Sequence, residues 1–128
     1  MEEDTVSQLT NAFELGRDKH DEAVLLRRQT WEVVAEANAI ARAAEHEALI
    51  LKSRVPAHGK NSEERAMNLI LDLEEGEYSQ EYKSLQAEIT ENRRTAAAGT
   101  RTIESLSDEI KFLQIQAQLL ANLASKIL

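Results

Sequence analysis

Three histidines, His20, His46 and His58, are the side chains of this sequence that ordinarily exchange protons near neutral pH. In di-metal helical bundles a glutamate stands three residues before a histidine, so that both ligands share one helix face. No carboxylate stands three residues before any of these histidines. Glu45 and Glu47 flank His46, but neighbouring helix positions point in different directions and cannot chelate together. The sequence therefore predicts no metal site, and His46 is expected on a solvated helix face.

Other catalytic patterns are missing as well. The stretch from His58 to Ser62 contains glycine and lysine, but it lacks the glycine spacing of a phosphate-binding P-loop and follows no strand. There is no cysteine, so thiolate chemistry and disulfides are excluded. We predict no catalytic residue, no cofactor and no small-molecule substrate, so the chain is expected not to be an enzyme.

Basic residues form the first candidate binding set. They surround a predicted turn and the middle of the last helix: Lys52, Arg54, Lys60, Arg65, Arg93, Arg94 and Arg101. Such side chains could bind phosphates with a salt-dependent affinity. The alternative is ordinary charge pairing at helical spacing, as between Glu91 and Arg94. Of these residues we select five as a DNA-binding hypothesis: Arg93, Arg94, Arg101, Lys60 and Arg65.

The charge distribution bears on that hypothesis. The formal net charge of −8 is unfavourable for a nucleic-acid-binding protein. Residues 1–22 and 66–82 each sum to −5, whereas residues 50–65 and 83–101 each sum to +2. DNA binding would therefore require assembly to bring the basic blocks together and turn the acidic ones away.

Aromatic residues form the second candidate set. Trp31, Tyr78 and Tyr82 could stack on unpaired bases. Both tyrosines also lie on an apolar helical seam, so packing in the core is the alternative interpretation.

The elements that must position these residues are helices. From Tyr78 to Ile127, apolar and small residues recur alternately every four and three positions. This 3.5-residue repeat is typical of a helix that packs against other helices, as in a coiled coil. Asn92 on this seam is expected to fix the register of packing. Ala96 and Gly99 would permit a close approach by another helix.

Near its end this helix is apolar over more than one face, which predicts that it is surrounded by other helices. Two Phe, two Tyr and one Trp cannot fill a thick core in a chain of 128 residues. We therefore predict a homo-oligomer that assembles through the C-terminal helix. The predicted interface consists of Ile103, Leu106, Ile110, Leu113, Leu120 and Ile127.

The predicted fold is all-α: a long antiparallel helical hairpin or coiled coil with a short middle helix, in one domain of residues 1–128. The first helix is expected at about 5–54, with a possible bend at Gly16. Pro56 and Gly59 then make a turn over 55–61. Helices at about 62–75, capped by Asn61 with Glu64, and at about 79–127 follow. Their continuity through Gly76 stays open, and the hairpin register would place Gly16 near Gly99.

The N-terminus has no apolar core typical of a signal peptide, and no run approaches the roughly 18 apolar residues of a membrane span. A cytoplasmic protein without a membrane partner is expected.

The segment Gly59-Lys60-Asn61-Ser62-Glu63-Glu64-Arg65, set between a long first helix and a Leu-rich segment with a long amphipathic helix, resembles small helical proteins of tailed phages. The layout is similar to the phage recombination mediator family. The resemblance implies a non-catalytic, ring-like oligomer in the host cytoplasm that acts in DNA recombination or replication, binding single-stranded DNA, a recombinase, or both. The alternative is a structural coiled-coil adaptor or assembly chaperone that binds only protein partners.

Overall fold

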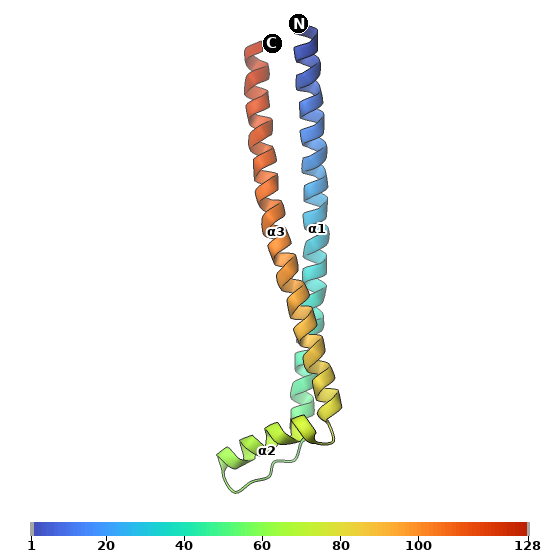
Figure 1. The fold of residues 1–128 in the computed structure, drawn as a ribbon, viewed down its shortest axis with the longest axis vertical. Helices are drawn as coiled ribbons and strands as arrows, with labels where there is room; N and C mark the ends of the chain where they lie inside the picture. Colours follow the sequence, from blue (N-terminus) through green and yellow to red (C-terminus); the bar gives the residue numbers. More distant parts are fainter. Residues whose placement is uncertain (1, 128) are drawn as a thin grey trace. The chain divides into compact units, whose positions relative to one another are not determined.

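A computed structural model describes residues 2–127 of the chain, with side chains from residue 4 onward. It contains three helices, α1 (Glu2–Arg54), α2 (Ser62–Glu75) and α3 (Ser79–Ile127), shown in Figure 1. No strand occurs among the described residues, so the all-α prediction is confirmed. Helix α1 begins three residues earlier than expected and continues through Gly16 without a break in its helical assignment.

The contacts of the chain fall into two compact units. We call residues 34–97 the turn unit, and residues 2–33 with 98–127 the terminal unit. Helices α1 and α3 pack together in each unit. The prediction of a single domain stays a prediction.

In the turn unit, α1 contributes a row of buried side chains spaced by three and four residues: Val34, Ala37, Ala41, Ala44, Ala48 and Leu51. This spacing keeps one face of α1 against its neighbour, and the alanines let the two backbones approach closely. Ala44, Ala48 and Leu51 cluster with Leu85 of α3. The core of the turn unit is therefore thin and alanine-rich.

The turn between α1 and α2 is held by backbone geometry and caps. Gly59 has φ 141°, which a residue with a side chain rarely adopts. The side chain of Asn61 accepts a hydrogen bond of 2.8 Å from the Glu64 N–H, and the Glu64 carboxylate accepts one of 3.2 Å from the Lys60 N–H. The predicted cap of α2 is thus confirmed.

Gly76 separates α2 from α3. Its N–H completes the last turn of α2 by donating to the carbonyl of Asp72 at 2.8 Å, and its extended backbone, with φ −84° and ψ −166°, ends the helix there. The two helices are therefore distinct, which settles a point that the sequence left open.

In the terminal unit, Ala23 of α1 packs with Leu106 and Ile110 of α3. The register follows from two polar contacts between the helices. Arg27 Nη1 donates to Ser107 Oγ at 3.3 Å, and Gln114 Nε2 lies 3.5 Å from His20 Nε2. The residue numbers of each pair add to 134. In this unit, a residue of α1 therefore lies opposite the residue of α3 whose number brings the sum to about 134.

This register corrects one expectation. Gly16 does not lie near Gly99; it lines a groove together with Ala117 and Leu120. The prediction failed because it aligned the helices from the turn without allowing for the length of the segment between Arg54 and Ser79.

Candidate interaction surfaces

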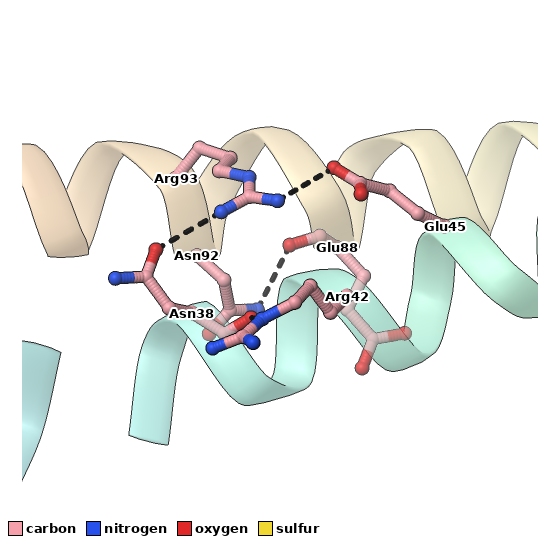
Figure 2. Close-up of polar contacts among 6 residues, drawn as sticks. All are labelled: Asn38, Arg42, Glu45, Glu88, Asn92 and Arg93. Atoms are coloured by element: carbon pink, nitrogen blue, oxygen red, sulfur yellow. Dashed lines mark hydrogen bonds and ion pairs between the residues drawn. The ribbon is translucent and has the colours of Figure 1, made fainter. Parts of the chain in front are cut away.

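Arg93 links α3 to α1 in the turn unit (Figure 2). Its Nη1 donates to Asn38 Oδ1 at 3.0 Å, and its Nη2 donates to Glu45 Oε1 at 2.8 Å. The side chains of Arg93 and Glu45 are 43% and 45% exposed, so water weakens the ion pair. Arg93 thus joins two helices of its own chain, which leaves its guanidinium less available for a phosphate.

Asn92 does not play the role expected of it. Its Nδ2 donates to the Glu88 carbonyl at 2.8 Å, one turn back on the same helix (Figure 2). The cross-helix polar contact comes from the next residue, Arg93. Sequence reasoning missed this because the partner on α1 follows from the register, which the heptad repeat of α3 alone does not specify.

The other four residues of the DNA-binding hypothesis lie on several elements. Arg94 is highly exposed and pairs with Glu91 at 3.7 Å, the surface pairing that the sequence offered as the alternative. Arg101 is exposed on α3, in the terminal unit. Lys60 precedes α2, and Arg65 Nη1 donates to the Gly59 carbonyl at 3.5 Å. DNA binding by these residues stays a prediction.

The three aromatic candidates differ in burial: the two tyrosines pack in the core, and Trp31 is exposed. Tyr78 and Tyr82 pack against the core cluster of the turn unit, as the alternative interpretation expected. The Lys52 ammonium lies 5.8 Å from the centroid of the Tyr82 ring, in a cation–π contact. Trp31 is 55% exposed in the terminal unit.

His58 is fixed in the loop before α2. Its Nε2 lies 2.8 Å from the Asp72 carboxylate, and Asn68 Nδ2 lies 3.2 Å from its Nδ1. Asn68 also donates to the His58 carbonyl at 2.8 Å. Both ring nitrogens therefore have partners within the chain, and the arrangement serves to hold the loop on α2.

His46 is exposed on α1, in keeping with the solvated face expected for it, and His20 is half-buried beside Gln114. Among the described residues no three His, Cys, Asp or Glu side chains are grouped as metal ligands would be.

The predicted oligomer interface is largely covered within the chain. Ile103, Leu106, Ile110 and Leu113 are buried in the terminal unit. Leu120 is half-buried and Ile127 is 43% exposed. The heptad repeat thus identifies residues that pack, and the structure assigns four of the six to packing within the monomer. The use of any of them between copies stays a prediction.

A second apolar row on α3 remains open to solvent. It consists of Phe112, Ile115, Leu119 and Leu123, which are 63%, 61%, 63% and 48% exposed. We call these four residues the outer stripe. Their spacing of three, four and four residues places them on one side of the helix, about a third of a turn from the buried row. The end of α3 therefore has two apolar faces, and only one is buried.

Beyond Leu113 the packing between the two helices opens. A groove of about 520 Å³ lies there, lined mainly by apolar residues that include Phe13, Gly16 and Leu120. Ala117 lines the groove and is exposed, although it continues the buried row. A Cβ placed on Gly16 would meet nothing within 4 Å. The small residues at this level leave space that side chains of α1 and α3 do not fill.

Comparison with protein families, with curated proteins and with solved structures finds no match to this chain. None of the described helices combines the length and the apolar character needed to cross a membrane.

Proposed function

We propose that this chain is a non-catalytic helical assembly protein, which presents an apolar helix face to a helix of another protein molecule. The observation that carries the proposal is the outer stripe, four large apolar side chains that are 48–63% exposed on one side of α3. Exposed apolar rows at helical spacing usually pack against a partner helix. This is the adaptor or assembly-chaperone alternative of the sequence analysis.

Two further features support a role in binding rather than catalysis. Both nitrogens of His58 are used to hold a loop, with Asp72 and Asn68 as their partners. The groove near Gly16 is lined mainly by apolar side chains. An apolar groove suits contact with a protein, and a histidine with both nitrogens hydrogen-bonded is poorly placed for proton transfer to a ligand.

Site-specific photo-cross-linking tests this function. A photoreactive phenylalanine replaces Phe112 in the stripe, and in a control it replaces Gln118, which is exposed on α3 but lies off the stripe. Irradiation of cells that express the full chain should produce a covalent protein adduct at position 112 and little at position 118. Mass spectrometry identifies the adduct. Equal adducts at both positions, or none at 112, would contradict the proposal.

Single-stranded DNA binding, as in a recombination mediator that also contacts a recombinase, is a second candidate. It is supported by Arg94 and Arg101, whose side chains are exposed on α3. The negative net charge and the commitment of Arg93 to Glu45 weigh against it.

Fluorescence anisotropy with a labelled single-stranded oligonucleotide over a salt series tests this candidate. If Arg94 and Arg101 each neutralise a phosphate, replacing both by alanine should reduce the log–log salt slope by roughly 0.7 for each arginine removed. The Arg93→Ala variant is the control and should change the slope less. Absence of binding by the wild-type protein at low salt would remove the DNA role and leave the assembly role.

A further inference from the structure

Helix α2 has an exposed apolar patch of its own. Met67, Ile70 and Leu71 are 65%, 57% and 45% exposed. They stand at positions i, i+3 and i+4, so their side chains share one side of the helix. We call these three residues the α2 patch. Leu73, which is buried, lies on a different side, so the patch is not the face by which α2 packs on its own chain.

A second side of α2 is occupied by the loop 55–61. Asp72 Oδ2 lies 2.8 Å from His58 Nε2, and Asn68 Nδ2 lies 3.2 Å from His58 Nδ1. In Figure 1 the loop runs along one side of α2. At about 100° per residue, Asn68 and Asp72 are rotated by about 100° and 140° from Met67. The contacts that hold the loop therefore leave the α2 patch open to solvent.

Four exposed glutamates border the α2 patch. Glu63 and Glu64 lie one turn before it, and Glu74 and Glu75 lie one turn after it. Among the described residues none of these four carboxylates forms an ion pair. Glu64 accepts a hydrogen bond from a backbone N–H, which leaves its charge in place. The surface is therefore apolar at its centre and negative at both ends.

The two pairs of glutamates differ in what they do for the helix. Negative charge is favourable near the N-terminus of a helix and unfavourable near its C-terminus. Glu63 and Glu64 therefore stabilise the start of α2. Glu74 and Glu75 stand in its last turn, which contains no basic residue. Helix α2 itself gains no stability from these two charges.

The negative charge of the turn unit is concentrated in this segment. Residues 34–97 contain twelve Asp or Glu and eight Lys or Arg, a net charge of −4. Residues 60–77 contain six and two of these, which is also −4. The rest of the unit is neutral, because six glutamates there match its six cations, Arg42, Lys52, Arg54, Lys83, Arg93 and Arg94.

The two cations of residues 60–77 do not neutralise the α2 patch. Lys60 precedes the first turn of α2. Arg65 donates to the Gly59 carbonyl at 3.5 Å, and it is rotated by about 160° from Met67. No other Lys or Arg belongs to α2. The side of α2 that carries the patch is therefore without a basic residue of that helix.

We propose that the α2 patch binds a basic amphipathic helix of another protein. The apolar side chains of that helix cover Met67, Ile70 and Leu71, and its Lys or Arg side chains pair with the glutamates at the two ends. From Ser62 to Glu75, α2 is about 21 Å long, which accommodates about four turns of a partner helix. This surface lies in the turn unit, and the inference does not depend on the function proposed for the outer stripe.

The same charges disfavour other occupants. The glutamates repel the phosphates of nucleic acids and of anionic lipids. If the α2 patch packed on the same patch of a second copy, the glutamates of one helix would face those of the other. Like charges placed opposite one another oppose association. A partner with basic residues around an apolar row is complementary to this surface.

Fluorescence anisotropy with a designed peptide tests the proposal. The probe is a labelled amphipathic helix of leucine and lysine, as long as α2, and its control has glutamate in place of every lysine. The full chain should bind the basic peptide at low salt and less tightly as the salt concentration rises. It should bind the acidic peptide at least about tenfold more weakly. Absence of binding by the basic peptide, or equal binding of both, would overturn the inference.

Variants that remove charge then locate the site. Glu74→Gln with Glu75→Gln should weaken binding of the basic peptide by about fivefold at low salt, as expected for the loss of two exposed ion pairs. Glu32→Gln with Glu36→Gln is the matched control, since it removes the same charge from exposed positions on α1. It should change the affinity by less than about twofold. Equal effects of the two variants would show attraction to the net charge alone, which would refute the site on α2.

Variants that remove apolar side chains test the centre of the patch. Met67→Ser with Ile70→Ser should weaken binding at least about tenfold. Phe112→Ser with Leu119→Ser removes two side chains of the outer stripe, each 63% exposed, and should weaken it less. Circular dichroism checks that the helices persist in every variant. A larger effect of the substitutions in the outer stripe would place the peptide there, contrary to the inference.

Sedimentation equilibrium separates a basic partner from a second copy of this chain. Met67→Ser with Ile70→Ser should have the same molar mass as the wild-type protein, because the proposed partner is a different protein. A lower mass for this variant would show that a second copy covers the α2 patch, and would overturn the inference.

Discussion

Replacing Leu51 by alanine examines the packing that holds the turn unit together. Leu51 is 2% exposed and clusters with Ala44, Ala48 and Leu85. Two of these neighbours are already alanines, so little side-chain volume is available to collapse into the space. Truncation of a buried leucine costs about 2.7–5 kcal/mol, with the larger values where the cavity persists. We expect the free energy of unfolding to fall by about 3–4 kcal/mol and the melting temperature to fall by about 10 °C or more.

Leu49→Ala is the matched control, since it makes the same substitution two residues away on the same helix. Leu49 is 64% exposed, and exposed substitutions usually change stability by less than about 0.5 kcal/mol. Urea denaturation, followed by circular dichroism at one protein concentration, compares the two variants with the wild-type protein. Equal destabilisation by the two substitutions, or the larger effect from Leu49→Ala, would refute the assignment of Leu51 to the core.

Three further predictions concern two glycines and one ion pair. Gly16→Ala should raise the stability by about 0.5–1 kcal/mol, seen as a higher melting temperature, because the position is helical and a Cβ there meets no atom within 4 Å. Gly59→Ala should lower the stability by more than about 1 kcal/mol in the same thermal assay, because φ is 141° and a Cβ would press on the backbone of Arg65; an unchanged melting temperature would contradict the turn geometry. A double-mutant cycle on Arg93 and Glu45 should give a coupling of about 0.2–1 kcal/mol that shrinks in high salt, since the pair is half-exposed. Zero coupling at low salt would argue against the link between α1 and α3.

The sequence was sufficient for the fold class and for most helix bounds. Pro56 and Gly59 interrupt helical geometry by local sterics, and Asn61 with Glu64 forms a cap within four residues. These are short-range effects, so they can be derived without knowing what a helix packs against. The buried row Ile103, Leu106, Ile110 and Leu113 was likewise visible, because helical periodicity marks the residues that must leave water.

Only the tertiary structure decided the partners of these residues. The helical periodicity predicts that Leu113 packs against another helix. The same periodicity would arise from packing on the chain's own α1 or on a second copy, and the structure shows packing on α1. The level of α1 against α3 depends on the segment from Arg54 to Ser79, so Gly16 meets the region of Ala117 rather than Gly99. Arg93 likewise has its partner Glu45 on α1, 48 residues away in the sequence. Contacts between distant segments depend on register and on the path of the turn, which no local pattern in the sequence specifies.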